Sequence, residues 1–290
     1  MQSAERPAVP ADGSALYAAQ WGAGTPSVLA LHGITSTHMA WPEVANRLPD
    51  VTLLAPDLRG RGRSAHLGGP YGFATHVADL VALLDSAGCE RVVVVGHSMG
   101  GFVAVALAAT HPDRVSRLVL VDGGLPLGRP GEEPVGSIDD VLGPAAERLS
   151  MTFPSRDAYR DFWRAHPALG PIWGPAVERY VDNDLVGQAP ELHPSCSEAA
   201  MRTDGAELVD HAAAAAALVR VTAPISFLRA ERGLLDAEPL YPEETAARWL
   251  NTGPGVDSST VPDTNHYSVV LADHGADAVA AAVLGASRVH

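Results

Sequence analysis

A serine stands between two glycines in the pentapeptide Gly96-His-Ser-Met-Gly100. The pentapeptide follows a run of four valines at 92–95 and precedes an apolar, alanine-rich stretch. A tight strand-to-helix turn crowds its own backbone, so glycine is favoured on either side of the residue that the turn presents. In such a turn Ser98 is held above the sheet at a helix N-terminus, where developing negative charge is favoured. The alternative is a glycine-rich corner with an incidental serine, and the strand-turn-helix context favours a nucleophile.

A second segment that could assist acyl chemistry is Leu31-His-Gly-Ile-Thr35, at the end of a predicted buried strand. A free backbone N–H at this point could face the nucleophile. We therefore predict that Ile34 N–H and Met99 N–H form an oxyanion hole, in which one donor contributes about 3–4 kcal/mol to transition-state stabilisation. His32 is predicted to be a packed structural histidine, and His97 to be a neighbour of the serine rather than a participant.

The elements that must position these residues follow an alternating pattern, in which short β-branched runs separate segments of helical periodicity. The runs are continuous rather than alternating, as expected for strands covered on both faces. Such a pattern predicts a parallel sheet with crossover helices. The predicted strands are 27–32, 51–55, 91–95 and 117–121, and the predicted helices are 39–48, 77–87 and 99–110.

The pattern is interrupted in the second half of the chain. From about Gly123 to Val219 no strand is expected, because proline, glycine, aromatic residues and helix-period segments dominate. Strands are predicted again at 224–228 and 258–261, and a final helix at 272–284. The predicted organisation is an N-terminal tail at 1–13, a core domain formed by 14–122 and 220–290, and a helical cap domain at 123–219.

Several motifs together resemble the α/β-hydrolase superfamily from about residue 14 onward. They are HGIT at 32–35, DLRGRGRS at 57–64, GHSMGG at 96–101 and LVLVD at 118–122, followed by the insertion and a late histidine. The resemblance implies an α/β fold with a mostly parallel central sheet, helices on both faces and an inserted helical cap. It is specific for the fold and hardly specific for the substrate. The residues interpreted as shaping a tight loop in DLRGRGRS are Asp57, Gly60, Gly62 and Ser64.

The resemblance also implies where the general base lies, in a loop after the last strand. Pro262-Asp-Thr-Asn-His266 has that position, with a predicted strand before it and a helix after it. Of the twelve histidines, His266 alone combines this chain order with this context. His274 lies deeper in the helix, and His290 is a terminal residue.

The acid departs from the family's commonest pattern, in which an aspartate follows the strand after the cap as G-x-x-D. Here the segment reads Leu228-Arg-Ala-Glu-Arg-Gly233, with glycine where the aspartate is expected. Some branches, including haloalkane dehalogenases and a group of resorcylic-lactone hydrolases, place the acid at the end of the strand after the nucleophile. Asp122 has that position, and we predict it as the acid, with Asp236 as the next candidate. Glu238 after a loop insertion, and Glu231 after an inward turn, stay open.

Aromatic residues are concentrated at 150–181, although the whole chain is only 6% aromatic. Most of them are expected to build the core of the cap. Tyr159, Phe162 and Trp163 share one helix face at i, i+3 and i+4. We predict that this face contributes to an apolar substrate pocket. Trp41 and Met151 are weaker candidates for the same lining.

Bulk composition excludes several classes of partner. The formal net charge is −14, and arginine supplies all twenty basic residues, so nucleic acid and anionic membranes are not expected partners. No signal-like N-terminus or run of about twenty apolar residues is present, which predicts a cytoplasmic protein. Cys89 and Cys196 are predicted to be free thiols. No metal or organic cofactor is implied.

These expectations converge on a carboxylic-ester hydrolase or lactonase. Its expected substrate is a small ester or lactone with a hydrophobic body, an aromatic one included. Ser98 would form an acyl-enzyme, with His266 as base and then acid and a carboxylate orienting the imidazole. A serine nucleophile argues against dehalogenase and epoxide hydrolase chemistry, which uses an aspartate there in this family. Thioester cleavage, carbon–carbon bond hydrolysis and a slow-turnover, ligand-binding signalling role are the alternatives. The oligomeric state, a homodimer included, stays open.

Overall fold

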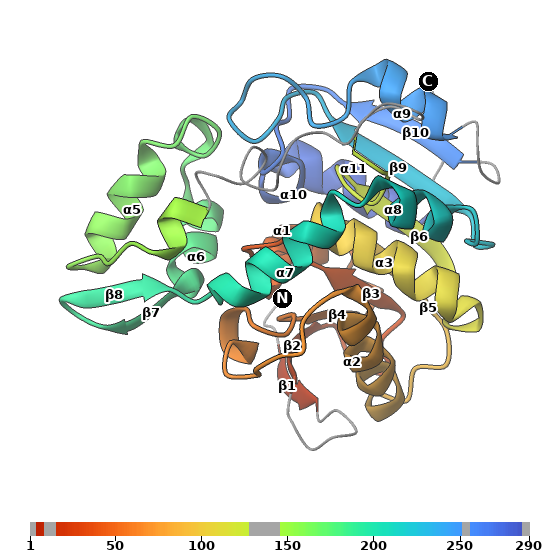
Figure 1. Ribbon diagram of the computed structural model, residues 1–290, viewed down its shortest axis with the longest axis horizontal. Coiled ribbons are helices and arrows are strands. Elements are labelled where there is room, and N and C mark those ends of the chain that lie inside the picture. Colours follow the sequence, from red (N-terminus) through yellow and green to blue (C-terminus); the bar gives the residue numbers. More distant parts are fainter. Residues whose placement is uncertain (1–3, 9–15, 128–145, 251–255, 286–290) are drawn as a thin grey trace.

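The computed structural model describes residues 4–8, 16–127, 146–250 and 256–285. Their main feature is an eight-stranded sheet with the order β1-β2-β4-β3-β5-β6-β9-β10 (Figure 1). β1 and β2 run antiparallel to their neighbours, and all the other neighbouring strands are parallel. The strands are β1 (Ala4–Ala8), β2 (Leu16–Trp21), β3 (Val28–Leu31), β4 (Leu53–Pro56), β5 (Val92–His97), β6 (Val115–Val121), β9 (Ile225–Ala230) and β10 (Val256–Val261).

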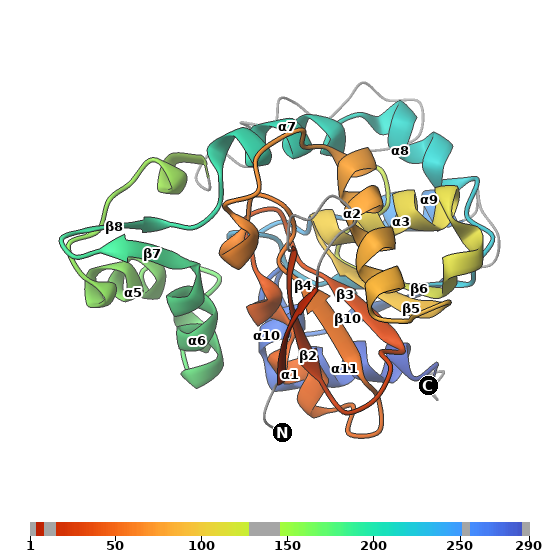
Figure 2. The same cartoon turned by 90° about the horizontal axis from the view of Figure 1, so that it is seen from below.

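Helices cover both faces of the sheet, and Figure 2 shows α2, α3 and α8 on one side and α1, α10 and α11 on the other. Strand side chains alternate between two hydrophobic clusters, as the pleat requires. In β6, for example, Leu118 and Leu120 belong to one cluster and Val119 and Val121 to the other. The helices are α1 (Pro42–Asn46), α2 (Phe73–Ser86), α3 (Met99–Thr110), α5 (Arg156–Arg164), α6 (Pro175–Asp184), α7 (Glu198–Leu208), α8 (His211–Leu218), α9 (Glu243–Leu250), α10 (Ser268–Leu271) and α11 (Asp273–Val283).

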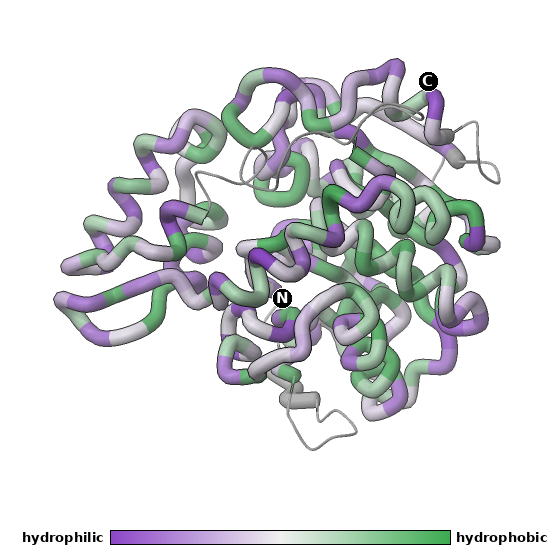
Figure 3. Tube along the Cα trace, in the orientation of Figure 1, coloured by the Kyte–Doolittle hydropathy of each residue, from purple (hydrophilic) through white to green (hydrophobic). Residues whose placement is uncertain are grey.

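The predicted fold class is thereby confirmed, and the hydropathy pattern explains why it could be predicted. Figure 3 shows hydrophobic segments concentrated in the central strands and α3. These strands are buried on both faces, so they read as continuous apolar runs. The N-terminal region differs from the expectation of a tail, because Ala4–Ala8 pairs with β2 as an edge strand. The helix expected at 39–48 is split into a short 3₁₀ turn at His38–Ala40 and α1, which begins at Pro42.

The chain between β6 and β9 contains a strand pair that the sequence pattern did not predict. β7 (Leu185–Gln188) and β8 (Glu191–Pro194) form an antiparallel hairpin apart from the main sheet. Both strands are short and largely exposed, so they lack the continuous apolar run by which the buried strands were recognised. The expectation of no strand between 123 and 219 was therefore wrong.

The same stretch of chain occupies two places in the molecule. In Figure 2 the elements α5, α6, β7 and β8 form a lobe at one end, while α7 and α8 run along the layer of α2 and α3. Leu208 and Leu218 belong to the hydrophobic cluster of the core. The structure thus places the end of the predicted cap range, including α8, against core helices.

Within the described residues, no helix combines the length and apolar character needed to cross a bilayer. Cys89 and Cys196 are free and buried. Burial raises the pKa of the Cys196 thiol to about 11. Among the same residues, no group of three or more His, Cys, Asp or Glu side chains could hold a metal ion.

Candidate active site

Ser98 lies at the turn between β5 and α3, where its φ of 54° and ψ of −124° form a backbone conformation that residues other than glycine rarely adopt. The two flanking glycines are required by close backbone contacts. A Cβ on Gly96 would lie 2.3 Å from the Gly100 carbonyl oxygen, and one on Gly100 would lie 2.1 Å from the Leu31 carbonyl oxygen. The turn is therefore tight because it packs against the end of β3, and it leaves the Ser98 side chain partly exposed.

His266 and Asp122 form a hydrogen-bonded pair beside this turn. His266 Nδ1 donates to Asp122 Oδ2 at 2.7 Å, and Ala230 N donates to Asp122 Oδ1 at 3.2 Å. Both side chains are buried. Because the proton lies on Nδ1, Nε2 is the basic atom of the imidazole. His266 and Ser98 line the same pocket, which is the arrangement that a base and a nucleophile need.

The other acid candidates lie elsewhere in the loop after β9. Asp236 Oδ1 accepts hydrogen bonds from Arg232 Nε at 2.8 Å and from Asn265 Nδ2 at 2.9 Å. The hydrogen bond from Arg232 lowers the pKa of Asp236. Glu231 accepts from the backbone N–H of Asp263, and Glu238 is exposed. Asp236 thus supports the residue before His266, and Asp122 contacts the imidazole itself.

His97 holds the backbone of the candidate base. Its Nε2 donates to the His266 carbonyl oxygen at 2.8 Å, and the two imidazole rings lie 4.7 Å apart between centroids. Burial, and next the proximity of the second imidazole, keep the pKa of His97 well below its ordinary value. His97 is therefore neutral, with its proton on Nε2, and it positions the loop. The sequence predicted that His97 lies beside Ser98, but it did not predict the hydrogen bond to His266.

The segment predicted to supply an oxyanion donor is held by His32. His32 Nε2 accepts from Leu58 N at 2.9 Å, so Nδ1 carries the proton and donates to the Gly33 carbonyl oxygen at 2.7 Å. Burial lowers the pKa of His32 to about 4, which keeps the ring neutral. Among the described residues, no hydrogen bond uses Ile34 N–H or Met99 N–H, and both residues line the pocket with Ser98.

The DLRGRGRS turn packs directly behind this segment. Asp57 is fully buried and accepts from His38 N at 2.7 Å and from Arg63 N at 2.9 Å. A Cβ on Gly62 would lie 2.4 Å from Asp57 Oδ2, and one on Gly60, where φ is +80°, would lie 2.6 Å from Ala200 Cβ. The glycines thus let the turn close around Asp57 and let α7 approach it.

The pocket over Ser98 is mostly apolar. Its wall includes residues that the sequence did not single out, of which Tyr267 follows the candidate base directly in the chain. The lining residues are Gly33, Ile34, Thr35, Ser36, His97, Ser98, Met99, Phe102, Leu127, Tyr180, Leu208, Leu234, Leu240, His266 and Tyr267.

The three predicted substrate-contacting aromatics have different surroundings. Trp163 lines a smaller cavity that shares Tyr180 and Tyr267 with the pocket over Ser98. Tyr159 and Phe162 line neither cavity. Both stack within the aromatic core of the lobe, and Tyr159 is fully buried. The weaker candidates lie apart as well, because Trp41 is buried in the core and Met151 is exposed on the surface.

A buried charge in the lobe was not anticipated. Arg148 Nη1 donates to Asp184 Oδ2 at 2.5 Å and to Tyr159 OH at 2.6 Å. The guanidinium also lies over the Trp163 ring, 5.0 Å from its centroid. Arg148 and Asp184 are both nine-tenths buried and balance each other's charge. No sequence signal marks this pair, because its members are distant in the chain.

Comparison with known proteins shows the family of the chain. The family model for the alpha/beta hydrolase fold matches residues 26–199, which is more than half of the chain. Lipase LipV of Mycobacterium tuberculosis is 44% identical over 113 residues, 39% of this chain and 43% of that protein. A putative carbamate hydrolase, RutD, of Caulobacter sp. (strain K31) is 38% identical over 99 residues, 33% of this chain and 37% of that protein. The chain thus aligns with less than half of the length of these relatives.

Solved structures resemble the whole chain. E-2-(acetamidomethylene)succinate hydrolase superposes with a TM-score of 0.81 at 22% identity, covering 98% of this chain and 100% of that one. The thioesterase domain from the curacin biosynthetic pathway gives 0.74 at 24% identity, covering 98% and 100%. At these identities the likeness concerns the fold. Together with the family match, it shows that the chain belongs to the α/β-hydrolase family.

Proposed function

We propose that the protein hydrolyses a carboxylic ester or lactone through an acyl-enzyme on Ser98. The observation that supports this most directly is the hydrogen bond from His266 Nδ1 to Asp122 Oδ2, because it leaves Nε2 as a base at the pocket that contains Ser98. A nucleophile, a base and an orienting acid on one pocket are the components of acyl transfer.

The first half of the proposed reaction forms the acyl-enzyme. Ser98 Oγ attacks the acyl carbon while His266 Nε2 takes its proton. The oxyanion of the tetrahedral intermediate accepts from Ile34 N–H and Met99 N–H, the two donors that no other described group uses. The intermediate collapses, the bond to the alcohol oxygen breaks, and the imidazolium returns the proton to that oxygen. Asp122 stabilises the imidazolium throughout.

The second half releases the acid. A water molecule attacks the acyl carbon and gives a proton to His266 Nε2, and the second tetrahedral intermediate is held by the same two amides. When the bond to Ser98 Oγ breaks, the imidazolium protonates the serine. The carboxylic acid leaves, and the enzyme returns to its starting state.

The pocket wall supports an apolar substrate. Among its described residues, Phe102, Leu127, Leu208, Leu234 and Leu240 are hydrophobic, and no arginine, aspartate or glutamate lines it. An uncharged group of moderate size gains from burial against such a wall. A phosphorylated or strongly anionic group would lose its hydration there without a compensating charge.

A fluorophosphonate probe and a substrate panel test this proposal. The wild-type protein should label once, at Ser98, and should hydrolyse hydrophobic esters or lactones. Ser98→Ala should take no label and lose turnover. Matched thioesters, amides, carbamates and a carbon–carbon substrate complete the panel, since the named relatives include a thioesterase domain, an (acetamidomethylene)succinate hydrolase and a putative carbamate hydrolase. Preference for one of these redefines the leaving group. Full activity in Ser98→Ala, or no labelling of the wild type, would overturn the proposal.

A further inference from the structure

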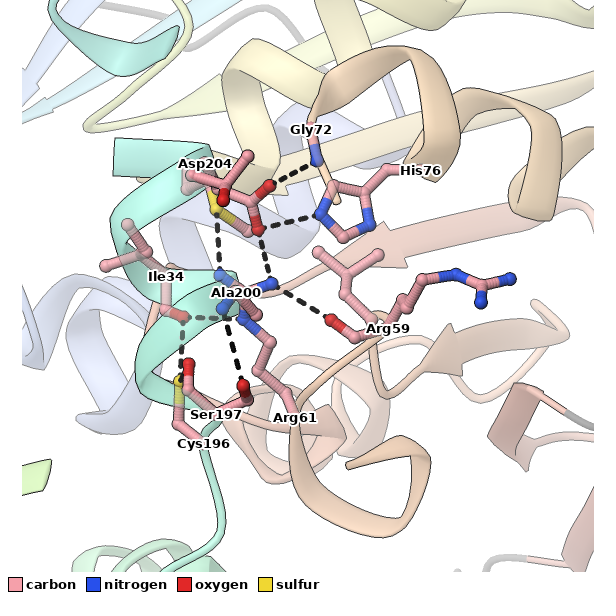
Figure 4. A network of polar contacts seen from close by, with 12 residues as sticks. Ile34, Arg59, Arg61, Gly72, His76, Cys196, Ser197, Ala200 and Asp204 are labelled. Carbon is pink, nitrogen blue, oxygen red and sulfur yellow. Dashed lines mark hydrogen bonds and ion pairs between the residues drawn. The ribbon is translucent and has the colours of Figure 1, made fainter. Parts of the chain in front are cut away.

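Arg61 is an arginine without solvent exposure, directly behind the oxyanion segment. Its Nε donates to the Ile34 carbonyl oxygen at 2.9 Å, and its Nη1 donates to the Arg59 carbonyl oxygen at 2.9 Å and to Asp204 Oδ2. Nη2 lies 3.8 Å from Met99 Sδ. Arg61 therefore contacts both residues that are proposed to bind the oxyanion, although it does not line the pocket itself. Figure 4 shows Arg61 between Ile34 and Asp204.

The charge of Arg61 is balanced by Asp204, which lies in the chain between β6 and β9. Asp204 belongs to α7 and also accepts from His76 Nε2 of α2 at 2.9 Å and from Gly72 N at 2.7 Å. Burial opposes its ionisation, but these hydrogen bonds and the charge of Arg61 outweigh it and lower the pKa of Asp204. The carboxylate is thus a fixed anchor between α7, α2 and the DLRGRGRS turn.

Two further hydrogen bonds connect the residues before α7 to the DLRGRGRS turn. Gly62 N donates to Ser195 Oγ at 3.2 Å, and Ser197 N donates to the Gly60 carbonyl oxygen at 2.8 Å. Cys196 Sγ lies 3.7 Å from the Ile34 carbonyl oxygen, the atom that Arg61 Nε also contacts. The start of α7 and the oxyanion segment are therefore joined through the turn.

The orientation of Ile34 N–H depends on the two peptide planes that flank Ile34. The preceding plane, which contains this N–H, is held by hydrogen bonds from His32 Nδ1 at 2.7 Å and Ser36 N at 3.1 Å to the Gly33 carbonyl oxygen. The following plane is held by Arg61 Nε. With both planes fixed, the donor is preorganised, and preorganised donors stabilise an oxyanion without reorganising during the reaction.

We propose that Arg61 is a positioning residue for the oxyanion hole and that Asp204 couples this role to α7. The coupling makes the placement of α7 a condition for full activity of the site. The inference rests on the proposed function, because an oxyanion hole matters only if Ser98 forms the acyl-enzyme.

The neighbouring ion pair between Arg59 and Asp79 provides a matched control. Arg59 Nε and Nη2 donate to the two carboxylate oxygens of Asp79 at 2.8 and 2.7 Å, and both side chains are buried. In Figure 4 the side chain of Arg59 extends away from Ile34. A role limited to stabilising the turn predicts equal effects for the two arginines, whereas a positioning role predicts an effect on catalysis from Arg61 alone.

The test compares Arg61→Lys with Arg59→Lys, and Asp204→Asn with Asp79→Asn. Each lysine keeps the charge for its aspartate, but Arg61→Lys loses the planar donor to Ile34. We expect Arg61→Lys to lower kcat and the rate of fluorophosphonate labelling by about tenfold or more, with KM within about twofold. For Arg59→Lys, kcat, KM and the labelling rate should each stay within about twofold of the wild-type value. Asp204→Asn should slow labelling more than Asp79→Asn.

Labelling rates are measured on protein whose fold is verified by circular dichroism. Equal labelling rates in Arg61→Lys and Arg59→Lys would overturn the inference. If Arg61→Lys does not fold, the asparagine pair decides, and equal rates in Asp204→Asn and Asp79→Asn would overturn it. A wild type that takes no label contradicts the proposed function instead, so the two failures are distinguishable.

Discussion

His266 Nδ1 and Asp122 Oδ2, separated by 2.7 Å, connect the loop after β10 to the end of β6. The backbone reinforces this pairing, because Asp122 has a φ of 46° and its N–H donates to the Leu228 carbonyl oxygen at 2.7 Å. The carboxylate is thus anchored to β9 through its backbone and through Ala230 N. The proposed acid, Asp122, therefore lies one strand earlier than the acid in the family's commonest arrangement.

Asp122→Asn should lower kcat by three to four orders of magnitude, as the equivalent change does in serine proteases, because the amide favours the wrong imidazole tautomer. The asparagine oxygen can still accept from Ala230 N, so the protein should fold. Steady-state kinetics on the best ester or lactone measure the effect.

Asp236→Asn is the control for this change, since Asp236 contacts Asn265 and not the imidazole. It should reduce kcat by no more than a few-fold. A near-normal Asp122→Asn enzyme together with an inactive Asp236→Asn enzyme would assign the acid to the loop after β9 instead.

The parts of the site that could be predicted from sequence are those in which local pattern and position coincide. The turn at Ser98 has glycines that only a crowded backbone requires, and α3 begins and ends where the apolar stretch predicts. His266 was identified by its place between a strand and a helix. The choice of Asp122 depended on a glycine at the usual acid position.

The remaining features depend on contacts between distant segments. Arg61 and Asp204 lie 143 residues apart, and nothing in either neighbourhood marks them as partners. The contact of His97 with the His266 backbone is equally long-range, at 169 residues. The hairpin β7–β8 was not predicted because exposed, two-stranded pairs lack the hydrophobic signal of core strands.

Replacing His97 with phenylalanine should affect catalysis more than stability. The change removes the hydrogen bond from Nε2 to the His266 carbonyl oxygen, which is worth about 1 kcal/mol, or about fivefold in kcat if all of it acts on the position of the base. It also removes the buried Nδ1, which has no hydrogen-bond partner among the described residues. The loss of this unpaired atom offsets part of the cost of leaving the His266 carbonyl oxygen unpaired, so the free energy of unfolding should fall by only about 1 kcal/mol. A large loss of stability with unchanged kcat would contradict a positioning role.

His32 should make the folded protein sensitive to mild acid. Burial lowers the pKa of His32 from the ordinary value of 6.5 to about 4 in the folded chain. Between these two pH values the unfolded chain therefore binds a proton at His32 that the folded chain does not bind. The free energy of unfolding should fall as the pH drops from 6.5 toward 4, and this histidine alone accounts for about 2 kcal/mol at pH 5. His97 acts in the same direction.

Urea unfolding of the wild type and His32→Gln at pH 7.5 and pH 5 measures this contribution. The glutamine cannot titrate and can both donate and accept a hydrogen bond, so the variant should lose less stability between the two pH values. An identical loss in both proteins would show that His32 is protonated in the native state.

Gly100→Ala tests whether close packing at the turn requires glycine. The added Cβ would lie 2.1 Å from the Leu31 carbonyl oxygen, in the backbone of β3, so relief requires movement of the sheet or of α3. We expect a loss of about 3 kcal/mol in the free energy of unfolding, the upper end for overpacking, and no labelling of Ser98. Gly68→Ala is the matched control, because nothing lies within 4 Å of its added Cβ, and it should stay within about 0.5 kcal/mol of the wild type. Urea denaturation measures the free energy of unfolding of both variants, and fluorophosphonate labelling measures the reactivity of Ser98. A stable Gly100→Ala protein that takes the label would mean that the turn can form without this glycine.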